Sequence, residues 1–209
     1  MIITNPSQFD QAITRFDAFN ALDPNLEVVA GANQPKELVY AHRMTEMLKR
    51  YSPDASEALL LAARCQHIGR WKTPRSDYPM TKPGYHQWRN ALKAFHADTA
   101  RNILSELAYD MATIDHVCGL VKKELPRTNL EAQTLEDVIV LVFLEHYLAQ
   151  FVATHSDYEE AKFVDILVKS LRKTSSQAHQ FILSMTTLPD ALAPLVKKLV
   201  TEHFSPALK

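Results

Sequence analysis

The chain has 209 residues, of which 46% are hydrophobic and 22% are charged, a composition typical of a globular protein with an apolar core. Its formal net charge is −1, which excludes attraction of nucleic acid or of an acidic membrane by overall charge alone. The two cysteines, Cys65 and Cys118, have no CxxC spacing, and this excludes a disulfide framework and a zinc–cysteine site.

Neither a secretion signal nor a membrane span is predicted. The N-terminal stretch lacks a basic region followed by a long apolar one. The longest apolar run, Val138 to Leu144, is far shorter than the roughly 20 residues that cross a bilayer as a helix. We therefore expect a soluble, cytoplasmic protein with no membrane partner.

Apolar side chains recur with the period of an α-helix over most of the chain, and its four glycines are too few for a fold rich in β-turns. Ser7 is placed to cap the first helix, and Pro35 is placed to begin the second. The predicted helices run, in chain order, from Ser7 to a break at Asp23-Pro24, over residues 36–51, from after Asp54 to about His67, over 85–108, 110–125 and 134–153, and then two or three times more with breaks near 174–176 and Pro189. The sequence therefore predicts an all-α protein, in which residues 71–84 form an ordered loop.

An acidic residue interrupts one apolar helix face. Positions three, four and seven residues apart share a face, and Glu145 shares its face with Val138, Leu141 and Leu148. A carboxylate there loses several kcal/mol of hydration unless it is paired, protonated or bound to a metal. Glu145 is therefore a site residue, half of a structural ion pair, or a carboxylate at the edge of the apolar stripe. Asp137 lies two turns earlier on nearly the same face, where a favourable position at the helix start is the simpler explanation.

Histidines lie among apolar residues on three successive predicted helices, at positions 42, 67 and 96. Each of them alone is more readily explained as a hydrogen-bonded core histidine than as a ligand. Together with an inward acid, however, imidazoles from different helices of a bundle form a set that holds a divalent cation. The predicted metal ligands are His42, His67, His96 and either Glu145 or Asp137.

Positive and aromatic side chains alternate from residue 70 to residue 93. The cations are Arg70, Lys72, Arg75, Lys82, Arg89 and Lys93, and the aromatic residues among them are Trp71, Tyr78, Tyr85 and Trp88. Guanidinium groups bind phosphate through paired hydrogen bonds and aromatic rings stack on bases, so this segment predicts a site for a nucleotide or another phosphorylated small molecule. The alternative is a solvated charged loop that the two tryptophans anchor.

Several segments resemble the HD-domain superfamily of metal-dependent phosphohydrolases. Tyr40-Ala41-His42-Arg43-Met44 is similar to the early-helix histidine segment of that superfamily, and His96-Ala97-Asp98-Thr99-Ala100 is similar to its His-x-x-x-Ala/Gly helix. Gln66-His67-Ile68-Gly69-Arg70 resembles the His-Asp doublet segment, with Gln66 in the place of the histidine and His67 in the place of the aspartate. Val121-Lys122-Lys123-Glu124 stands where the cyclic-dinucleotide branch has His-His-Glu.

This resemblance implies a single domain of residues 1–209 with an HD-like helical core at about 36–150 and extra helices at 156–209. It also implies that the late helix, at Asp137 or Glu145, supplies the last metal ligand. More specifically, the whole chain resembles the bacterial DUF4202 family. That likeness runs through Gln66-His67-Ile68-Gly69-Arg70-Trp71-Lys72-Thr73-Pro74-Arg75 and on to Tyr85-His86-Gln87-Trp88-Arg89.

The function that these features predict is metal-dependent hydrolysis of a nucleotide or a similar phosphorylated small molecule. Mixed nitrogen and oxygen ligands suit Mn, Fe, Ni, Co or Zn better than Mg or Ca, and such a metal would activate water and polarise a phosphoryl oxygen. The predicted substrate-binding residues are Gln66, Arg70, Trp71, Lys72, Arg75, Tyr85, Trp88 and Arg89. No residue is assigned a catalytic role.

Two alternatives to an enzyme stay open at this point. One is an inactive HD-like module that binds a phosphorylated ligand, and the other is a helical interaction protein without a metal site. A nucleic-acid surface is disfavoured, because the net charge is −1 and no recognised nucleic-acid-binding motif is present.

Overall fold

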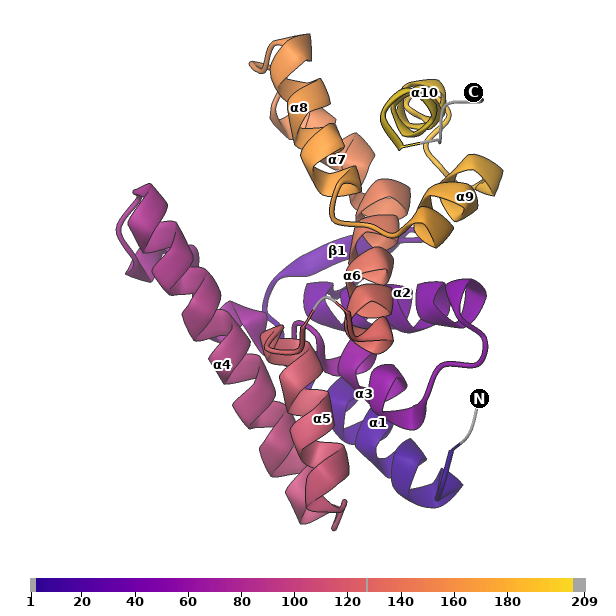
Figure 1. The fold of residues 1–209 in the computed structure, drawn as a ribbon. Helices are drawn as coiled ribbons and strands as arrows, with labels where there is room; N and C mark the ends of the chain where they lie inside the picture. Colours follow the sequence, from indigo (N-terminus) through magenta and orange to yellow (C-terminus); the bar gives the residue numbers. More distant parts are fainter. Residues whose placement is uncertain (1–2, 127, 205–209) are drawn as a thin grey trace. The chain divides into compact units, whose positions relative to one another are not determined.

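A computed structural model describes residues 3–126 and 128–204 and confirms a predominantly all-α protein (Figure 1). The helices are α1 (Pro6–Asn20), α2 (Lys36–Tyr51), α3 (Glu57–Cys65), α4 (Lys82–Glu106), α5 (Met111–Lys122), α6 (Leu130–Val142), α7 (Leu148–Thr154), α8 (Glu160–Leu171), α9 (Ser176–Ser184) and α10 (Ala193–Phe204). Two short 3₁₀ turns, η1 (Arg70–Lys72) and η2 (Arg75–Asp77), lie between α3 and α4, and a π-helical turn, η3 (Phe143–Tyr147), joins α6 to α7.

The helix ends follow from local capping. Helix α2 begins at Lys36 and ends at Tyr51, as the sequence predicts. Helix α1 differs at its start, because the side chain of Asn5, and not that of Ser7, accepts a hydrogen bond from a backbone N–H of the first turn. Helix α4 begins at Lys82 rather than at Tyr85, since the Thr81 hydroxyl accepts from the backbone N–H of Gly84 at 3.2 Å.

A β-hairpin lies between α1 and α2, where the sequence predicts no strand. Strand β1 (Leu26–Val29) pairs antiparallel with β2 (Ala32–Pro35), with Val29 opposite Ala32. The two turn residues, Ala30 and Gly31, have φ angles of 49° and 80°, and positive φ at both positions is the geometry that favours two-residue hairpins. The prediction missed it because β2 contains no β-branched or aromatic residue and the turn lacks the usual Asn-Gly or Asp-Gly pair.

The chain packs as two compact units, Met1–Ala132 and Gln133–Lys209. The boundary falls inside residues 36–150, which the resemblance gave as one core. A single domain of 209 residues therefore stays a prediction.

Helix α3 is the centre of the first unit, where α1, α2 and α5 pack against it. Residues 59–63 of this helix are at most 2% exposed. Because α3 is apolar on nearly every side, it is stable only when other helices surround it. Helices α4 and α5 lie side by side (Figure 1). The turn that follows α3 contacts both α2 and α4, because His67 stacks on Tyr40 and the carbonyl of Ile68 meets His96.

In the second unit, α10 packs against α8 and α9. The fully buried side chains of these three helices include Leu167, Leu171, Ile182, Val196 and Val200. This confirms the prediction of further amphipathic helices after Ser156, with breaks near 174–176 and Pro189.

Residues Leu130–Thr154, which comprise α6, η3 and α7, are long and apolar enough to cross a membrane. They are the single helical stretch of the described residues that meets this criterion of length and composition. Core helices of soluble proteins meet it as well. The prediction that no membrane is involved considered only the uninterrupted apolar run within this helix, and it stays a prediction.

The cap of α4 gives a first test of this fold. Replacing Thr81 by alanine is expected to lower the free energy of unfolding by about 1 kcal/mol, because a backbone N–H of the first turn loses its acceptor. Equilibrium urea denaturation measures the change. Thr201→Ala in the exposed interior of α10 is the control, and its effect is expected to stay within about 0.5 kcal/mol. A Thr81→Ala variant as stable as the control would contradict the assignment of this cap.

Candidate functional site

A small pocket lies in the first unit, between the turn after α3, the middle of α4 and the C-terminal end of α5. Its volume is about 20 Å³, which is enough for a group the size of a water molecule. It is lined by Gln66, His67, Arg70, Arg89, Leu92, Lys93, His96, Val121 and Lys123. The lining residues of α4 are three, four and seven positions apart, so they share one face of that helix.

The turn after α3 depends on a glycine. Gly69 has a φ of 66°, and its backbone N–H donates to the side chain of the buried Asn20 at 3.1 Å. A Cβ atom at this position would lie 2.7 Å from a ring carbon of Phe19 and 2.8 Å from one of Phe95. Glycine is therefore required both by the left-handed backbone and by the close approach of two aromatic rings.

His96 is held in one orientation at the pocket. Its Nδ1 lies 2.7 Å from the carbonyl oxygen of Ile68, and because a carbonyl only accepts, Nδ1 carries the proton. Burial lowers the pKa of His96 to about 3, with a further contribution from His67, so the ring is neutral at physiological pH. The lone pair on Nε2 is consequently available, and this atom has no hydrogen-bond partner among the described residues.

His67 lies between two charged groups. Its Nδ1 is 3.6 Å from a carboxylate oxygen of Glu37, and its Nε2 is 3.4 Å from Nη1 of Arg70. Its ring stacks on Tyr40 with centroids 4.1 Å apart, and the ring of His96 is 5.8 Å away. Burial lowers the pKa of His67 well below its usual range, and the neighbouring cations lower it further. His67 is therefore a neutral ring like His96.

Glu37 is a site residue that the sequence analysis did not identify. It is 6% exposed, and burial raises the pKa of its carboxyl to about 7. The signal was present in the sequence, because Glu37 heads an apolar face that continues through Ala41, Met44 and Leu48. An acid in the first turn of a helix is common for electrostatic reasons, and this made it look ordinary.

The pocket is surrounded by positive charge. Arg70, Arg89, Lys93 and Lys123 all line it. Lys123 was not predicted as a site residue, and it reaches the pocket because it ends α5 in the left-handed conformation, with φ of 60°. Arg70 also approaches Glu37, with its Nε 3.9 Å from a carboxylate oxygen.

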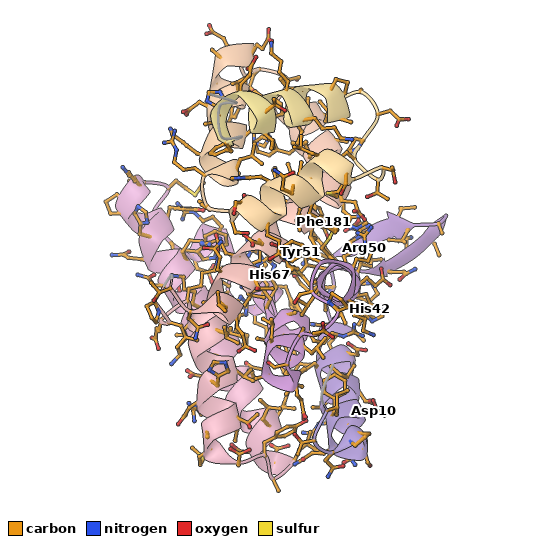
Figure 2. The ribbon with its side chains drawn as sticks, turned by 45° about the vertical axis from the view of Figure 1, so that its right-hand side comes forward. Asp10, His42, Arg50, Tyr51, His67 and Phe181 are labelled. Atoms are coloured by element: carbon orange, nitrogen blue, oxygen red, sulfur yellow. The ribbon has the colours of Figure 1, made fainter. Side chains whose placement is uncertain are left out.

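His42 lies elsewhere on α2. Its side chain is 46% exposed, and its Nε2 is 3.5 Å from a carboxylate oxygen of Asp17, which also binds Arg64 through two hydrogen bonds. Because successive residues of a helix are rotated by about 100°, His42 points about 160° away from Tyr40, on which His67 stacks. Figure 2 shows His42 and His67 on opposite sides of the α2 ribbon.

The two acidic candidates belong to the second unit. Asp137 accepts hydrogen bonds from the backbone N–H and the hydroxyl of Ser175, at 2.8 and 2.6 Å. Glu145 lies in the π-helical turn, where it accepts from the Thr187 hydroxyl at 2.6 Å and lies 3.1 Å from His146. Both carboxylates therefore have partners within their own unit.

Hydrogen bonds hold the aromatic loop before α4 in place. The guanidinium of Arg75 donates to the carbonyl oxygens of Tyr78 and Pro79, at 2.9 and 2.8 Å. The Trp88 indole N–H donates to the carbonyl of Thr73 at 2.9 Å, and its ring lies 5.1 Å from the guanidinium of Arg70. These contacts explain why the loop is ordered, as the sequence predicts.

The predicted substrate-binding residues thus fall into two groups. Those that line the pocket are Gln66, Arg70 and Arg89. Those outside its lining are Trp71, Lys72, Arg75, Tyr85 and Trp88. Within the second group, Trp71 and Lys72 both lie against the ring of Phe19, and Tyr85 lies beside Trp88.

The predicted metal ligands are brought together only in part. His67 and His96 are adjacent, whereas His42 contacts Asp17. Across residues 3–126 and 128–204, no three His, Cys, Asp or Glu side chains have the spacing to hold a metal ion. The metal therefore remains a prediction.

Comparison with known proteins adds a family and no reaction. No curated protein and no solved structure matches the chain significantly, and the resemblance to HD domains gains no support from these comparisons. The family described as "Domain of unknown function (DUF4202)" matches residues 10–196, a range that includes every residue of the pocket. Since this match covers most of the 209 residues, the chain belongs to the DUF4202 family.

Proposed function

We propose that the protein binds a phosphorylated small molecule, a nucleotide or a similar compound, with its phosphate group at the pocket between α3, α4 and α5. The observation that carries this proposal is the convergence of Arg70, Arg89, Lys93 and Lys123 on one small pocket. The net charge of the whole chain is −1, so this positive charge is a local feature and not a property of the entire surface.

The balance of charge at the pocket favours an anion. His67 and His96 are neutral there, and the carboxyl of Glu37 has its pKa raised to about 7, so its negative charge is only partly present at neutral pH. Arg89 and Lys93 are four residues apart on α4 and repel each other. Among the described residues, the side chain of neither has a hydrogen bond or an ion pair. A phosphate group between them would relieve this repulsion and accept charge-assisted hydrogen bonds from both.

Charge reversal at Arg89 tests the proposal. Isothermal titration with inorganic phosphate and with a nucleoside monophosphate is expected to show at least about a tenfold loss of affinity in Arg89→Glu, because a charged hydrogen bond becomes a repulsion. Arg101→Glu is the matched control, since Arg101 lies on the same helix but pairs with Asp115 at 2.7 Å and is not part of the pocket lining. Equal affinities of the two variants, or no binding of phosphate by the unmodified protein, would reject the proposal.

Metal-dependent hydrolysis of the bound ester is the second candidate. The observation that favours it is the pair of adjacent neutral imidazoles, His67 and His96, because the neutral ring is the form that ligates a metal. A metal of the transition series would supply an activated water. Elemental analysis of protein purified without chelators tests this candidate: a stoichiometric metal that is lost in His96→Ala supports it, and its repeated absence counts against it.

A further inference from the structure

Two buried acceptor atoms at the pocket are unsatisfied. Oε1 of Gln66 and Nε2 of His96 have no hydrogen-bond partner among the described residues, and the two residues are only 6% and 3% exposed. Both side chains line the pocket. Since nearly all buried polar atoms in native proteins are paired, an unpaired buried acceptor at a pocket marks a position where a group from outside the chain can bind.

The geometry of His96 fixes what kind of group is needed. Its Nδ1 donates to the carbonyl of Ile68 at 2.7 Å, so a neutral ring can only accept at Nε2. Oε1 of the Gln66 amide is likewise an acceptor. The missing partner is therefore a hydrogen-bond donor or a cation.

The surroundings favour a neutral donor over a cation. Arg70, Arg89, Lys93 and Lys123 line the same pocket and repel a further positive charge. The volume of about 20 Å³ suits small groups such as hydroxyls.

We propose that Gln66 Oε1 and His96 Nε2 each accept a hydrogen bond from a hydroxyl group of the ligand. Because one hydroxyl donates only one hydrogen bond, the ligand supplies two of them. The site then selects a phosphate ester that has two neighbouring hydroxyls, as the phosphates of sugars and other polyols have. The phosphate interacts with the surrounding cations, and the hydroxyls reach the two acceptors. This inference rests on the proposed function and names the class of phosphate that it concerns.

A pair of ligands tests the selection in the unmodified protein. Glycerol 3-phosphate and propyl phosphate have the same charged group and carbon number, and only the first has hydroxyls. Isothermal titration is expected to give at least about tenfold tighter binding of glycerol 3-phosphate, because sites built to bind a hydroxyl discriminate strongly against analogues that lack it. In Gln66→Leu, or in Gln66→Met of more similar length, this ratio is expected to fall toward one while propyl phosphate still binds. Circular dichroism and the melting temperature verify that the variants fold.

The outcomes separate this inference from the proposed function. Equal affinity for the two esters in the unmodified protein overturns the hydroxyl selection and leaves the phosphate site standing. A preference that arises only with added Mn²⁺, and that chelator abolishes, overturns it as well, because the two acceptors then hold a cation. If neither ester nor inorganic phosphate binds, the proposed function itself fails, and the selection fails with it.

Discussion

Replacing Gly69 by alanine is expected to lower the free energy of unfolding by about 3 kcal/mol. Part of this loss, about 1–2 kcal/mol, comes from placing a Cβ atom on a left-handed residue, since φ is 66° at this position. The rest, about 1–3 kcal/mol, is the cost of forcing a methyl group against two half-buried rings, because the new Cβ would lie 2.7 Å from Phe19 and 2.8 Å from Phe95.

Gly31→Ala separates these two contributions. Gly31 has φ of 80° in the hairpin turn, but a Cβ atom there would meet no atom within 4 Å. This control is therefore expected to lose only the backbone part, about 1–2 kcal/mol. Equilibrium urea denaturation of both variants gives the comparison. If Gly69→Ala loses no more stability than Gly31→Ala, the close packing of the turn against Phe19 and Phe95 is wrong.

Gly69→Ala is also expected to weaken phosphate binding. Gly69 lies between His67 and Arg70, so the shift that relieves the clash also moves two side chains of the pocket. Isothermal titration with inorganic phosphate measures this effect at a temperature where the variant stays folded. The control, Gly31→Ala, lies outside the pocket lining and is expected to bind as the unmodified protein does.

Most of the helices could be predicted because their signals are local. The apolar period and the capping residues lie within each helix, and α2 is predicted to the residue for this reason. The hairpin was missed because its stability does not come from strand-forming residues in β2. The hairpin is formed by backbone pairing and by the positive φ angles of Ala30 and Gly31, and side-chain periodicity predicts neither of these.

The pocket was predicted only in part, for a similar reason. Gln66, His67 and Arg70 are neighbours in one distinctive segment, and His96 interrupts an apolar face, so each gives a signal by itself. Glu37 and Lys123 come from two other helices, and each is ordinary in its own segment. Which residues of different helices meet depends on how the helices are rotated about their axes. His42 illustrates this, because its side chain is 46% exposed although it follows the buried Ala41 in the sequence.

Replacing Glu37 by glutamine is expected to raise stability at neutral and alkaline pH. Burial raises the pKa of this carboxyl from an ordinary value of 4.5 to about 7 in the folded protein. A raised pKa means that the folded state binds the proton more tightly, so this contribution to stability is complete below pH 4.5 and is lost as pH rises through about 7. At 1.36 kcal/mol per pKa unit, the ionised carboxylate costs about 3 kcal/mol above that range.

The difference in unfolding free energy between Glu37→Gln and the unmodified protein isolates this effect. The lowered pKa values of His67 and His96 act in the opposite sense, since their contribution is lost as pH falls below about 6.5. Both proteins contain these histidines, and the substitution affects His96 only through the charge of Glu37, which raises the His96 pKa but is a smaller cause than burial. Urea denaturation at pH 4.5, 6, 7 and 8 is expected to show that the variant gains up to about 3 kcal/mol relative to the unmodified protein as pH rises. Glu46→Gln, at an exposed position of the same helix, gives the effect of removing a carboxyl from the surface. If the difference in unfolding free energy between Glu37→Gln and the unmodified protein is the same at every pH, the pKa of the Glu37 carboxyl is not raised in the folded state. Glu37 is then ionised at neutral pH and contributes a full negative charge beside the pocket.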